Sequence, residues 1–422
     1  MNKNKQGGTT TLIKIAFRNI WRNKRRTVFC LLAVGIAVFF ILIYSSMIDG
    51  MTDSINQIVQ IFELGHIRIV SEIYEAEQEY LPVQYPIENG SNWRDIADSI
   101  KEISGVKAVF PRINTMASLQ ESTIKHAILW GINIEEEMSL NNFNLTERNN
   151  GLIEGRYPDI DANEIAIGHV FSNKTGLSIG DRIPLRTASA HFSDRFWSPV
   201  ITGIYNFDYI KFDENYIVAD FSRLQRLLGL ETGTQQLIVF TENDKYSASI
   251  ASMIRDVLTT DSIVTEWTDN YWVSMMKMII PIYTLVFLVF LIVASFLIIN
   301  TVVMIIHERI KEIGMMGSLG MTRFEIIKVF FFESLFLSIF GACLGVLIGG
   351  SLVGFLANYP FRLGDMYGNT FSDMPMSNAI FFSFSYGRLI MAWLMGVGVA
   401  SIFTLIPSLK SAFIEPVEAL KR

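Results

Sequence analysis

The sequence predicts a four-helix transmembrane α protein with a large α+β extracytoplasmic domain inserted between the first and second spans. Four stretches reach or nearly reach the roughly 20 apolar residues that cross a bilayer. One lies near the start of the chain and three lie in its last third. The roughly two hundred mostly polar residues between the first two stretches are enough for a folded domain.

Hydropathy, charge and helical periodicity together predict the segment boundaries. In chain order these are a cytoplasmic amphipathic helix at 1–27, a first span at 28–48, the extracytoplasmic domain with a stalk helix at each end at 49–277, a second span at 278–306, a cytoplasmic helical loop at 307–328, a third span at 329–357, an extracytoplasmic loop at 358–388, a fourth span at 389–407 and a cytoplasmic tail at 408–422.

The charge distribution predicts the orientation in the membrane. Residues 1–48 contain eight Lys and Arg and no acidic residue, so the remainder of a chain with net charge -6 carries -14. Basic residues also occur in the loop 307–328 and in the tail. By the positive-inside rule, both termini are cytoplasmic and the large domain is outside. The first apolar run is longer than the 7–15 residues of a signal-peptide core, which argues against cleavage.

Before the first span, the periodicity predicts an amphipathic helix that lies in the membrane interface. Its apolar positions are Ile13, Ala16, Phe17, Ile20 and Trp21. The opposite face carries Lys14, Arg18, Arg22 and Arg25. The alternative is a plain topology signal with no defined helix.

Helical spacing of apolar residues continues on both sides of the domain, which predicts two stalk helices. The first series is Ile48, Met51, Ile55, Ile58 and Phe62, and the second is Trp267, Tyr271, Met275 and Met278. Ordinary juxtamembrane linkers are the alternative. Within the domain, apolar patterns predict strands at 108–113, 127–132 and 236–240, helices at 93–103 and 221–228, and a turn at Gly180-Asp181.

The third predicted span contains Gly341, Gly345 and Gly349 at four-residue intervals. Small residues at this spacing allow helix backbones to approach closely in lipid. We expect them to pack against another helix, either within the subunit or in a partner. The alternative is that glycine is simply common in membrane helices.

Motifs of catalytic chemistry are absent from the sequence. It has no Walker A loop, no H-E-x-x-H zinc motif and no G-x-S-x-G nucleophile elbow. Within the predicted spans the only Asp, Glu, Lys or Arg is Glu333. Ion-coupled transporters usually need such groups at mid-membrane depth. These features predict no enzyme, no metal or cofactor bound by this chain, no nucleic-acid partner, and work that a partner protein drives. Both cysteines, Cys30 and Cys343, fall in predicted spans, so no disulfide is expected in the outer domain.

The loop between the second and third spans has the most distinctive local sequence. Its reading E-R-I-K-E-I-G, followed by S-L-G-M, has helical periodicity and ends at a glycine that can cap a helix. We expect a partner to bind through these residues: Glu308, Arg309, Lys311, Glu312, Ile313, Gly314, Met315, Met316, Leu319, Gly320 and Met321. The alternative is an ordinary cytoplasmic hairpin.

With this loop, the glycine-rich span and the ending P-V-E-A-L-K at 416–421, the chain resembles the permease family of MacB, LolC, LolE and FtsX. The opening A-F-R-N-I-W-R-N-K-R-R-T at 16–27 and the domain motifs N-E-I-A-I-G at 163–168 and G-L-S-I-G-D at 176–181 are also similar. The resemblance implies a type VII ABC transporter permease. In that family the loop after the second span is a coupling helix that docks on a separate ATPase, and the matching positions here are Glu308, Arg309, Glu312, Ile313, Gly314, Gly320 and Met321.

The layout is closest to the lipoprotein-releasing subunits LolC and LolE. The resemblance therefore implies a subunit of the bacterial cytoplasmic membrane that extracts lipoproteins from its outer leaflet. Its expected partners are two copies of an ABC ATPase that binds ATP and Mg²⁺, a second permease that is identical or homologous, a lipoprotein substrate, a periplasmic carrier and membrane lipids. The alternatives are a MacB-like efflux permease for peptides or antibiotics and, ranked last, an FtsX-like regulator of cell-wall hydrolases.

Overall fold

The computed structural model describes residues 3–22, 24–87, 91–119, 123–141, 143, 151–258, 261–308, 315–316, 318, 321–362, 377 and 379–412. The chain forms two compact units. The helical unit comprises Met1–Met51, Met278–Pro360 and Phe381–Arg422, and the domain unit comprises Thr52–Lys277 and Phe361–Ile380.

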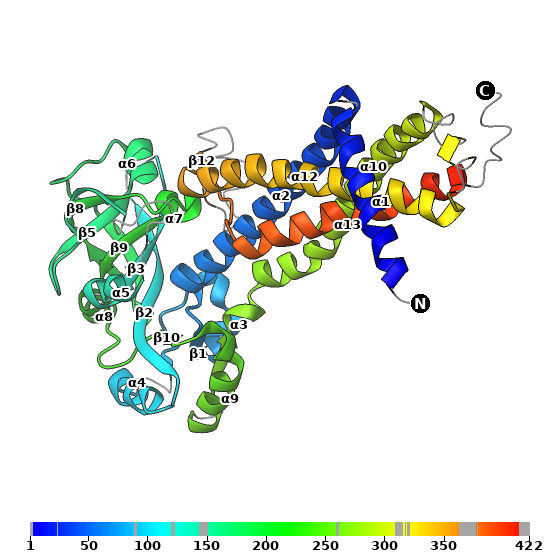
Figure 1. Ribbon diagram of the computed structural model, residues 1–422. Helices are drawn as coiled ribbons and strands as arrows, with labels where there is room; N and C mark the ends of the chain where they lie inside the picture. Colours follow the sequence, from blue (N-terminus) through cyan, green and yellow to red (C-terminus); the bar gives the residue numbers. More distant parts are fainter. Residues whose placement is uncertain are drawn as a thin grey trace. The chain divides into compact units, whose positions relative to one another are not determined.

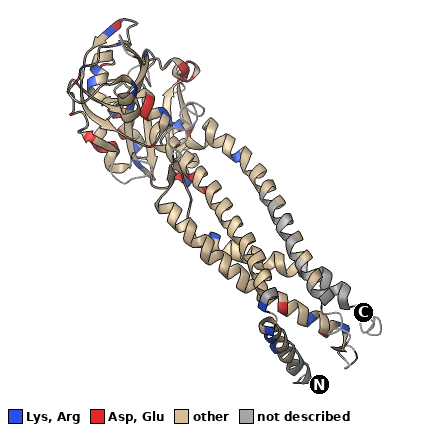
Figure 2. Ribbon diagram, turned by 90° about the horizontal axis from the view of Figure 1, so that it is seen from above, with Lys and Arg blue, Asp and Glu red and all other residues tan. Residues whose placement is uncertain are grey.

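The described residues form five long helices: α1 (Lys3–Arg22), α2 (Lys24–Ile58), α10 (Tyr271–Glu308), α12 (Arg323–Asn358) and α13 (Tyr386–Ala412). Figure 2 shows that charged residues are sparse on most of these helices and frequent on the domain. Among the described residues, three helical stretches are long and apolar enough to cross a membrane, namely Thr27–Glu63, Arg323–Asn358 and Tyr386–Phe403. In α10 the corresponding stretch is Tyr271–Val286, which is shorter than a span. The predicted second span at 278–306, and with it the count of four spans, therefore stays a prediction.

The helical unit has a core of small and branched side chains. Val34, Val38 and Leu42 of α2 pack with Ala342 of α12 and Ala392 of α13. Lipid tails are as apolar as these side chains, so the hydrophobic effect does not drive helices together within a bilayer. Close packing of this kind stabilises their association instead.

The N-terminal helix α1 packs on α12 through part of its apolar face. Ala16 and Ile20 are buried, and the ring of Phe17 meets that of Phe336 edge to face at 5.6 Å between centroids. Phe17 and Trp21 nevertheless remain 43% and 67% exposed. A helix therefore lies within the predicted range 1–27, with its apolar face divided between contact with α12 and exposed surface. Its place in the membrane interface stays a prediction.

The domain unit is built on a mixed sheet of 11 strands (Figure 1). Its strands are β1 (Ile67–Ser71), β2 (Val106–Leu119), β3 (His126–Ile132), β4 (Leu152–Gly155), β5 (Glu164–Gly168), β6 (Leu185–Ala188), β7 (Asp194–Trp197), β8 (Val200–Tyr205), β9 (Tyr216–Asp220), β10 (Gln236–Thr241) and β11 (Ser262–Glu266). The order is β11-β1-β10-β2-β3-β9-β5-β8-β4, with β6 pairing β2 and β7. The pairs β3–β9 and β5–β8 are parallel and the others are antiparallel. The predicted strands at 108–113, 127–132 and 236–240 lie in β2, β3 and β10.

Short helices flank this sheet: α3 (Glu72–Ala76), α4 (Trp93–Lys101), α5 (Ile134–Leu140), α6 (His169–Thr175), α7 (Ile210–Asn215), α8 (Phe221–Leu228) and α9 (Ser247–Val257). A π-helical turn, η1 (Val59–Glu63), follows α2, and the 3₁₀ turns are η2 (Gln78–Tyr80), η4 (Asp244–Tyr246) and η5 (Trp267–Asp269). A second, two-stranded sheet pairs β12 (Phe361–Arg362) with β13 (Ala379–Ile380).

The helix α8 occupies the range predicted for it, and local chemistry explains both ends. The carboxylate of Asp220 accepts a hydrogen bond from the Arg223 backbone N–H at 3.0 Å, which caps the first turn. Gly229 ends the helix in the left-handed region with φ of 71°. Between them, Leu224 and Leu228 are fully buried.

The long strand β2 joins two lobes of the domain. Its first half pairs with β10, over a core that α4 and α9 cover, and its second half pairs with β3. Where the pairing changes, the side-chain amide of Gln235 substitutes for a neighbouring strand. It accepts from the Asn114 N–H at 2.7 Å and donates to the Asn114 carbonyl at 2.9 Å. This satisfies backbone groups that burial would otherwise leave unpaired.

Candidate functional site

The predicted partner-binding loop is only partly within the described residues. Arg309, Lys311, Glu312, Ile313, Gly314, Leu319 and Gly320 lie outside them, and Glu308 is the last residue of α10. Met316 and Met321 pack against Ile326 and Phe330 in the first turns of α12. Met315 is 53% exposed. Of the two neighbouring methionines expected to bind a partner, Met315 is the more exposed.

The start of α12 is defined by a capping box. The Thr322 hydroxyl accepts from the Glu325 N–H at 3.4 Å, and the Glu325 carboxylate accepts from the Thr322 N–H at 2.8 Å. Two backbone donors at the helix end are thereby satisfied. This reciprocal pair sets where the loop ends and the span-length helix begins.

The three glycines of α12 lie against α2. A Cβ atom at Gly345 would stand 2.5 Å from the Gly35 carbonyl oxygen, and one at Gly341 would stand 2.9 Å from Val34 Cβ. At Gly349 the nearest atom, Leu42 Cδ1, would be 3.3 Å away. The two backbones therefore approach too closely at Gly341 and Gly345 for any side chain.

The end of the first stalk is fastened to the domain by a buried ion pair. Arg112 of β2 is 1% exposed and Glu137 of α5 is fully buried, with 2.6 Å between Nη2 and Oε2. The same Nη2 donates to the Ile61 carbonyl in η1 at 2.7 Å. Burial raises the pKa of Glu137, and the charge and hydrogen bonds of Arg112 oppose that rise. One guanidinium thus joins β2, α5 and the stalk.

Phe62, one residue further along the stalk, is the centre of an aromatic cluster. Its ring lies 4.9 Å from that of Phe212, 5.4 Å from Phe207 and 5.5 Å from Tyr209, measured between centroids. The rings of Trp130 and Phe143 complete the surround. Phe62 is 3% exposed, so the side chain at the end of the stalk is buried in the domain core. We name these six residues the Phe62 cluster.

The two stalks meet at Glu63. Its carboxylate accepts from Asn270 Nδ2 at 2.9 Å and lies 3.5 Å from the hydroxyl of Tyr209. Asn270 in turn accepts from the Trp272 N–H at 2.9 Å, at the beginning of α10. Val59 and Leu64 of the first stalk also pack with Val273 of the second. Hydrogen bonds and packing therefore connect the two helix ends to each other and, through Tyr209, to the Phe62 cluster.

A buried carboxyl group supports the loop that carries three of the cluster's rings. Asp213 is fully buried, and its Oδ1 accepts from the Phe207 N–H at 2.8 Å. Burial raises the pKa of Asp213 well above its usual value, while hydrogen bonds from the backbone oppose the rise. The side chain therefore holds the turn between Phe207 and Phe212 from inside.

Sequence reasoning predicted the two stalks, including Phe62, but not the groups that hold them. Arg112 lies in an apolar strand, and Glu137 ends a run of three glutamates, a pattern typical of solvated surface although Glu137 itself is buried. An isolated Arg within a buried strand pattern is the signal that could have identified the contact between β2, α5 and the stalk, because such a charge requires a buried partner.

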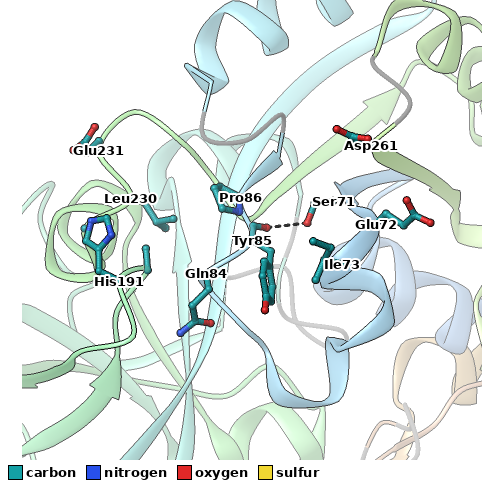
Figure 3. A pocket seen from close by; sticks show the side chains of 12 residues that line it. Ser71, Glu72, Ile73, Gln84, Tyr85, Pro86, His191, Leu230, Glu231 and Asp261 are labelled. Atoms are coloured by element: carbon teal, nitrogen blue, oxygen red, sulfur yellow. Dashed lines mark hydrogen bonds between the residues drawn. The ribbon is translucent and has the colours of Figure 1, made fainter.

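Elsewhere, the domain has a polar cavity of about 580 Å³. Figure 3 shows the segment Ser71–Ile73 on one side, His191, Leu230 and Glu231 on the other, and Tyr85 between them. The Ser71 hydroxyl donates to the Tyr85 carbonyl at 2.9 Å. The carboxylates of Glu72, Glu231 and Asp261 give the cavity a negative lining.

Three helical stretches of span length among the described residues, together with a large mixed-sheet domain, define a membrane protein with a folded domain outside its apolar helices. Two family models match the chain: the MacB-like periplasmic core domain over residues 27–257 and the FtsX-like permease C-terminal region over residues 284–416. The chain belongs to the MacB, LolC and FtsX family of ABC transporter permeases. Members of this family work with ATPase partners.

Curated relatives include LolC and MacB proteins. The lipoprotein-releasing system transmembrane protein LolC of Xylella fastidiosa (strain Temecula1) is 21% identical over 61% of this chain and 64% of its own length. LolC of Neisseria meningitidis serogroup B is 19% identical over 78% of this chain and 82% of its own length. The macrolide export ATP-binding/permease protein MacB of Bdellovibrio bacteriovorus is 26% identical over 54% of this chain and 31% of its own length.

Proposed function

We propose that this chain is the permease subunit of an ABC transporter that extracts lipoproteins from the outer leaflet of the cytoplasmic membrane. A separate ATPase supplies the work. The observation that carries the proposal is the joint at Arg112 and Phe62, where a helix of span length ends inside the core of the domain. Such a joint moves a domain mechanically without the need for a polar path across the bilayer.

In this proposal the ATPase binds the coupling helix at 307–328 and moves α10. Glu63 and Asn270 pass that motion to the first stalk, and Arg112 and Phe62 pass it to the sheet. The chain has four spans, both termini are cytoplasmic, and the domain is extracytoplasmic. It functions as a pair with a second permease, identical or homologous, together with two ATPase copies that bind ATP and Mg²⁺.

The substrate assignment is supported by the share of this chain that each relative matches. The two LolC proteins match 61% and 78% of this chain, and the MacB protein matches 54% of it. A second candidate function is a MacB-like efflux permease for peptides or antibiotics. It is supported by the match of residues 27–257 to the MacB-like periplasmic core.

Reconstitution separates these functions. The chain, its partner permease and its ATPase are placed in proteoliposomes with a fluorescent triacylated lipoprotein and a soluble lipoprotein carrier. The expected result is ATP-dependent transfer of the lipoprotein to the soluble fraction, lost in a variant ATPase that cannot hydrolyse ATP. If no transfer occurs while expression of the complex raises resistance to a macrolide or an amphipathic peptide, the efflux function replaces the proposed one.

A further inference from the structure

The segment that leads into α13 has anchors at both ends, and we name Ser377 together with Ala379–Arg388 the strap. Its first part belongs to the domain unit and its second part, from Phe381 onward, to the helical unit. Each anchor is made within its own unit. The strap is a connection between the units additional to the two stalks.

In the helical unit, the strap is bonded to the end of the first predicted span. The Ser46 hydroxyl donates to the Ser383 carbonyl at 2.6 Å, and the Ser383 N–H donates to the Ser46 carbonyl at 3.0 Å. Asp49 Oδ2 and Arg388 Nε are 2.5 Å apart, and the Arg388 guanidinium also donates to the Ser383 carbonyl. This set of bonds holds the strap to one turn of α2.

Gly50 makes this contact possible. A Cβ atom there would lie 2.2 Å from the Phe381 carbonyl oxygen and 2.9 Å from Phe382 Cα. Those are backbone atoms, so no side-chain rotation could relieve the overlap. Glycine lowers helix propensity, and its presence within α2 is explained by this close approach of the strap.

In the domain unit, the other end of the strap reaches the Phe62 cluster. Ser377 forms an antiparallel bridge with Tyr209, and its hydroxyl accepts from the Ala379 N–H at 3.1 Å. Tyr209 is 1% exposed, and its ring lies 5.5 Å from that of Phe62. The Tyr209 carbonyl also accepts from the Asp213 N–H at 2.9 Å. The first residue of the strap therefore contacts the segment 207–213, whose rings pack around Phe62.

We propose that the strap is a second mechanical input to the domain, through which α2 acts on Tyr209 directly. Only five residues separate the anchor at Ser377 from the anchor at Ser383. Because the reach of a short chain is limited, motion of α2 beyond that slack pulls on Tyr209. Gly50 and Arg388 are the positioning residues of this device. The inference rests on the proposed function, since it assumes that ATP drives α2.

The test uses the full chain in complex with its ATPase, compared without nucleotide and after trapping with ADP and vanadate. Hydrogen–deuterium exchange is measured separately at 59–64, on the stalk, and at 207–213, on the loop. Gly50→Ala adds the Cβ that displaces the strap, and Arg388→Met removes the ion pair as a second variant. Gly398→Ala is the matched control, since a Cβ at Gly398 meets no atom within 4 Å.

In the wild type and in Gly398→Ala, nucleotide trapping is expected to change exchange at both segments. In Gly50→Ala and Arg388→Met the change at 59–64 is expected to persist, while that at 207–213 is reduced to the part that arrives through the stalk. An undiminished change at 207–213 in both variants would overturn the proposed role of the strap. If the wild type shows no nucleotide-dependent change at either segment, the proposed function fails and the strap fails with it.

Discussion

Arg112 and Glu137 form an ion pair of 2.6 Å in which the two side chains are 1% and 0% exposed. The pair lies between the stalk carbonyl of Ile61 and the ring of Trp130, whose centroid is 5.2 Å from the guanidinium carbon. A buried pair of this kind adds little net stability compared with apolar residues. Removing one partner, however, leaves the other as an unpaired buried charge, which is strongly destabilising. Its position suggests that it specifies where the stalk enters.

Removal of either partner alone is therefore expected to be severe. Arg112→Met and Glu137→Leu should each lower the free energy of unfolding by about 3–5 kcal/mol. The double variant should be closer to wild type than either single variant, because no charge is left unpaired. Thermal unfolding of the full chain in detergent measures this, and two additive single effects would contradict the prediction.

Phe62→Ala should uncouple the stalk from the domain. Loss of a fully buried aromatic side chain costs about 3–5 kcal/mol. Phe192→Ala is the matched control, since Phe192 is 77% exposed, and its effect should stay within about 0.5 kcal/mol. Unfolding of the purified chain and ATP-driven transport by the complex are the two measurements. Equal effects of the two substitutions would show that the Phe62 cluster is not a core.

Asp213 should make stability depend on pH in a direction that can be derived. Burial raises the pKa of Asp213 in the folded state above its unfolded value. The folded state then binds more protons, so the contribution of this group to stability is present at low pH and is lost as pH rises from about 4 through the folded pKa. Asp213→Asn keeps the oxygen that accepts from Phe207 and removes this dependence.

The difference in unfolding free energy between wild type and Asp213→Asn should therefore move in favour of the variant as pH rises. Asp213→Ala, which loses the acceptor, should be less stable than Asp213→Asn at every pH, by about 1–3 kcal/mol. Chemical denaturation at a series of pH values tests both statements. A constant difference across the series would mean that the carboxyl group titrates alike in the folded and unfolded chains.

The glycines of α12 should tolerate alanine in an order set by the space at each. Gly345→Ala places a Cβ 2.5 Å from a backbone oxygen and should destabilise by about 1–3 kcal/mol. Gly349→Ala meets a flexible leucine at 3.3 Å and should cost less. Gly398→Ala meets nothing within 4 Å and should be neutral or favourable. Melting temperatures in detergent give the ranking, and the reverse order would refute the α2–α12 packing.

Charge reversal in the predicted coupling helix should affect the partner alone. Glu312→Lys is expected to abolish co-purification of the ATPase without lowering the melting temperature of the chain. Asp98→Lys, at an exposed position of the domain, is the control for a change of net charge. Normal co-purification of the ATPase with Glu312→Lys would count against a role for this loop in coupling.

The sequence by itself determined the elements whose signal is local. The helices of span length follow from runs of apolar residues that no soluble fold requires. The helix at 221–228 follows from its period, an N-cap at Asp220 and a terminating Gly229. The spacing of Ile55, Ile58 and Phe62 predicted a helix that continues past the first span, and all three are buried. Each of these patterns can be recognised from residues that are close together in the sequence.

Tertiary structure alone decided what those elements touch. Nothing local to Arg112 indicates that its partner is Glu137 or that both serve the stalk, since the contact joins segments 25 and 51 residues away. The strap is a similar case, because Gly50 and Phe381 are adjacent only in the fold. Local propensity specifies the helices and strands, whereas the burial of charge and the close approach of backbones depend on residues brought together from distant parts of the chain.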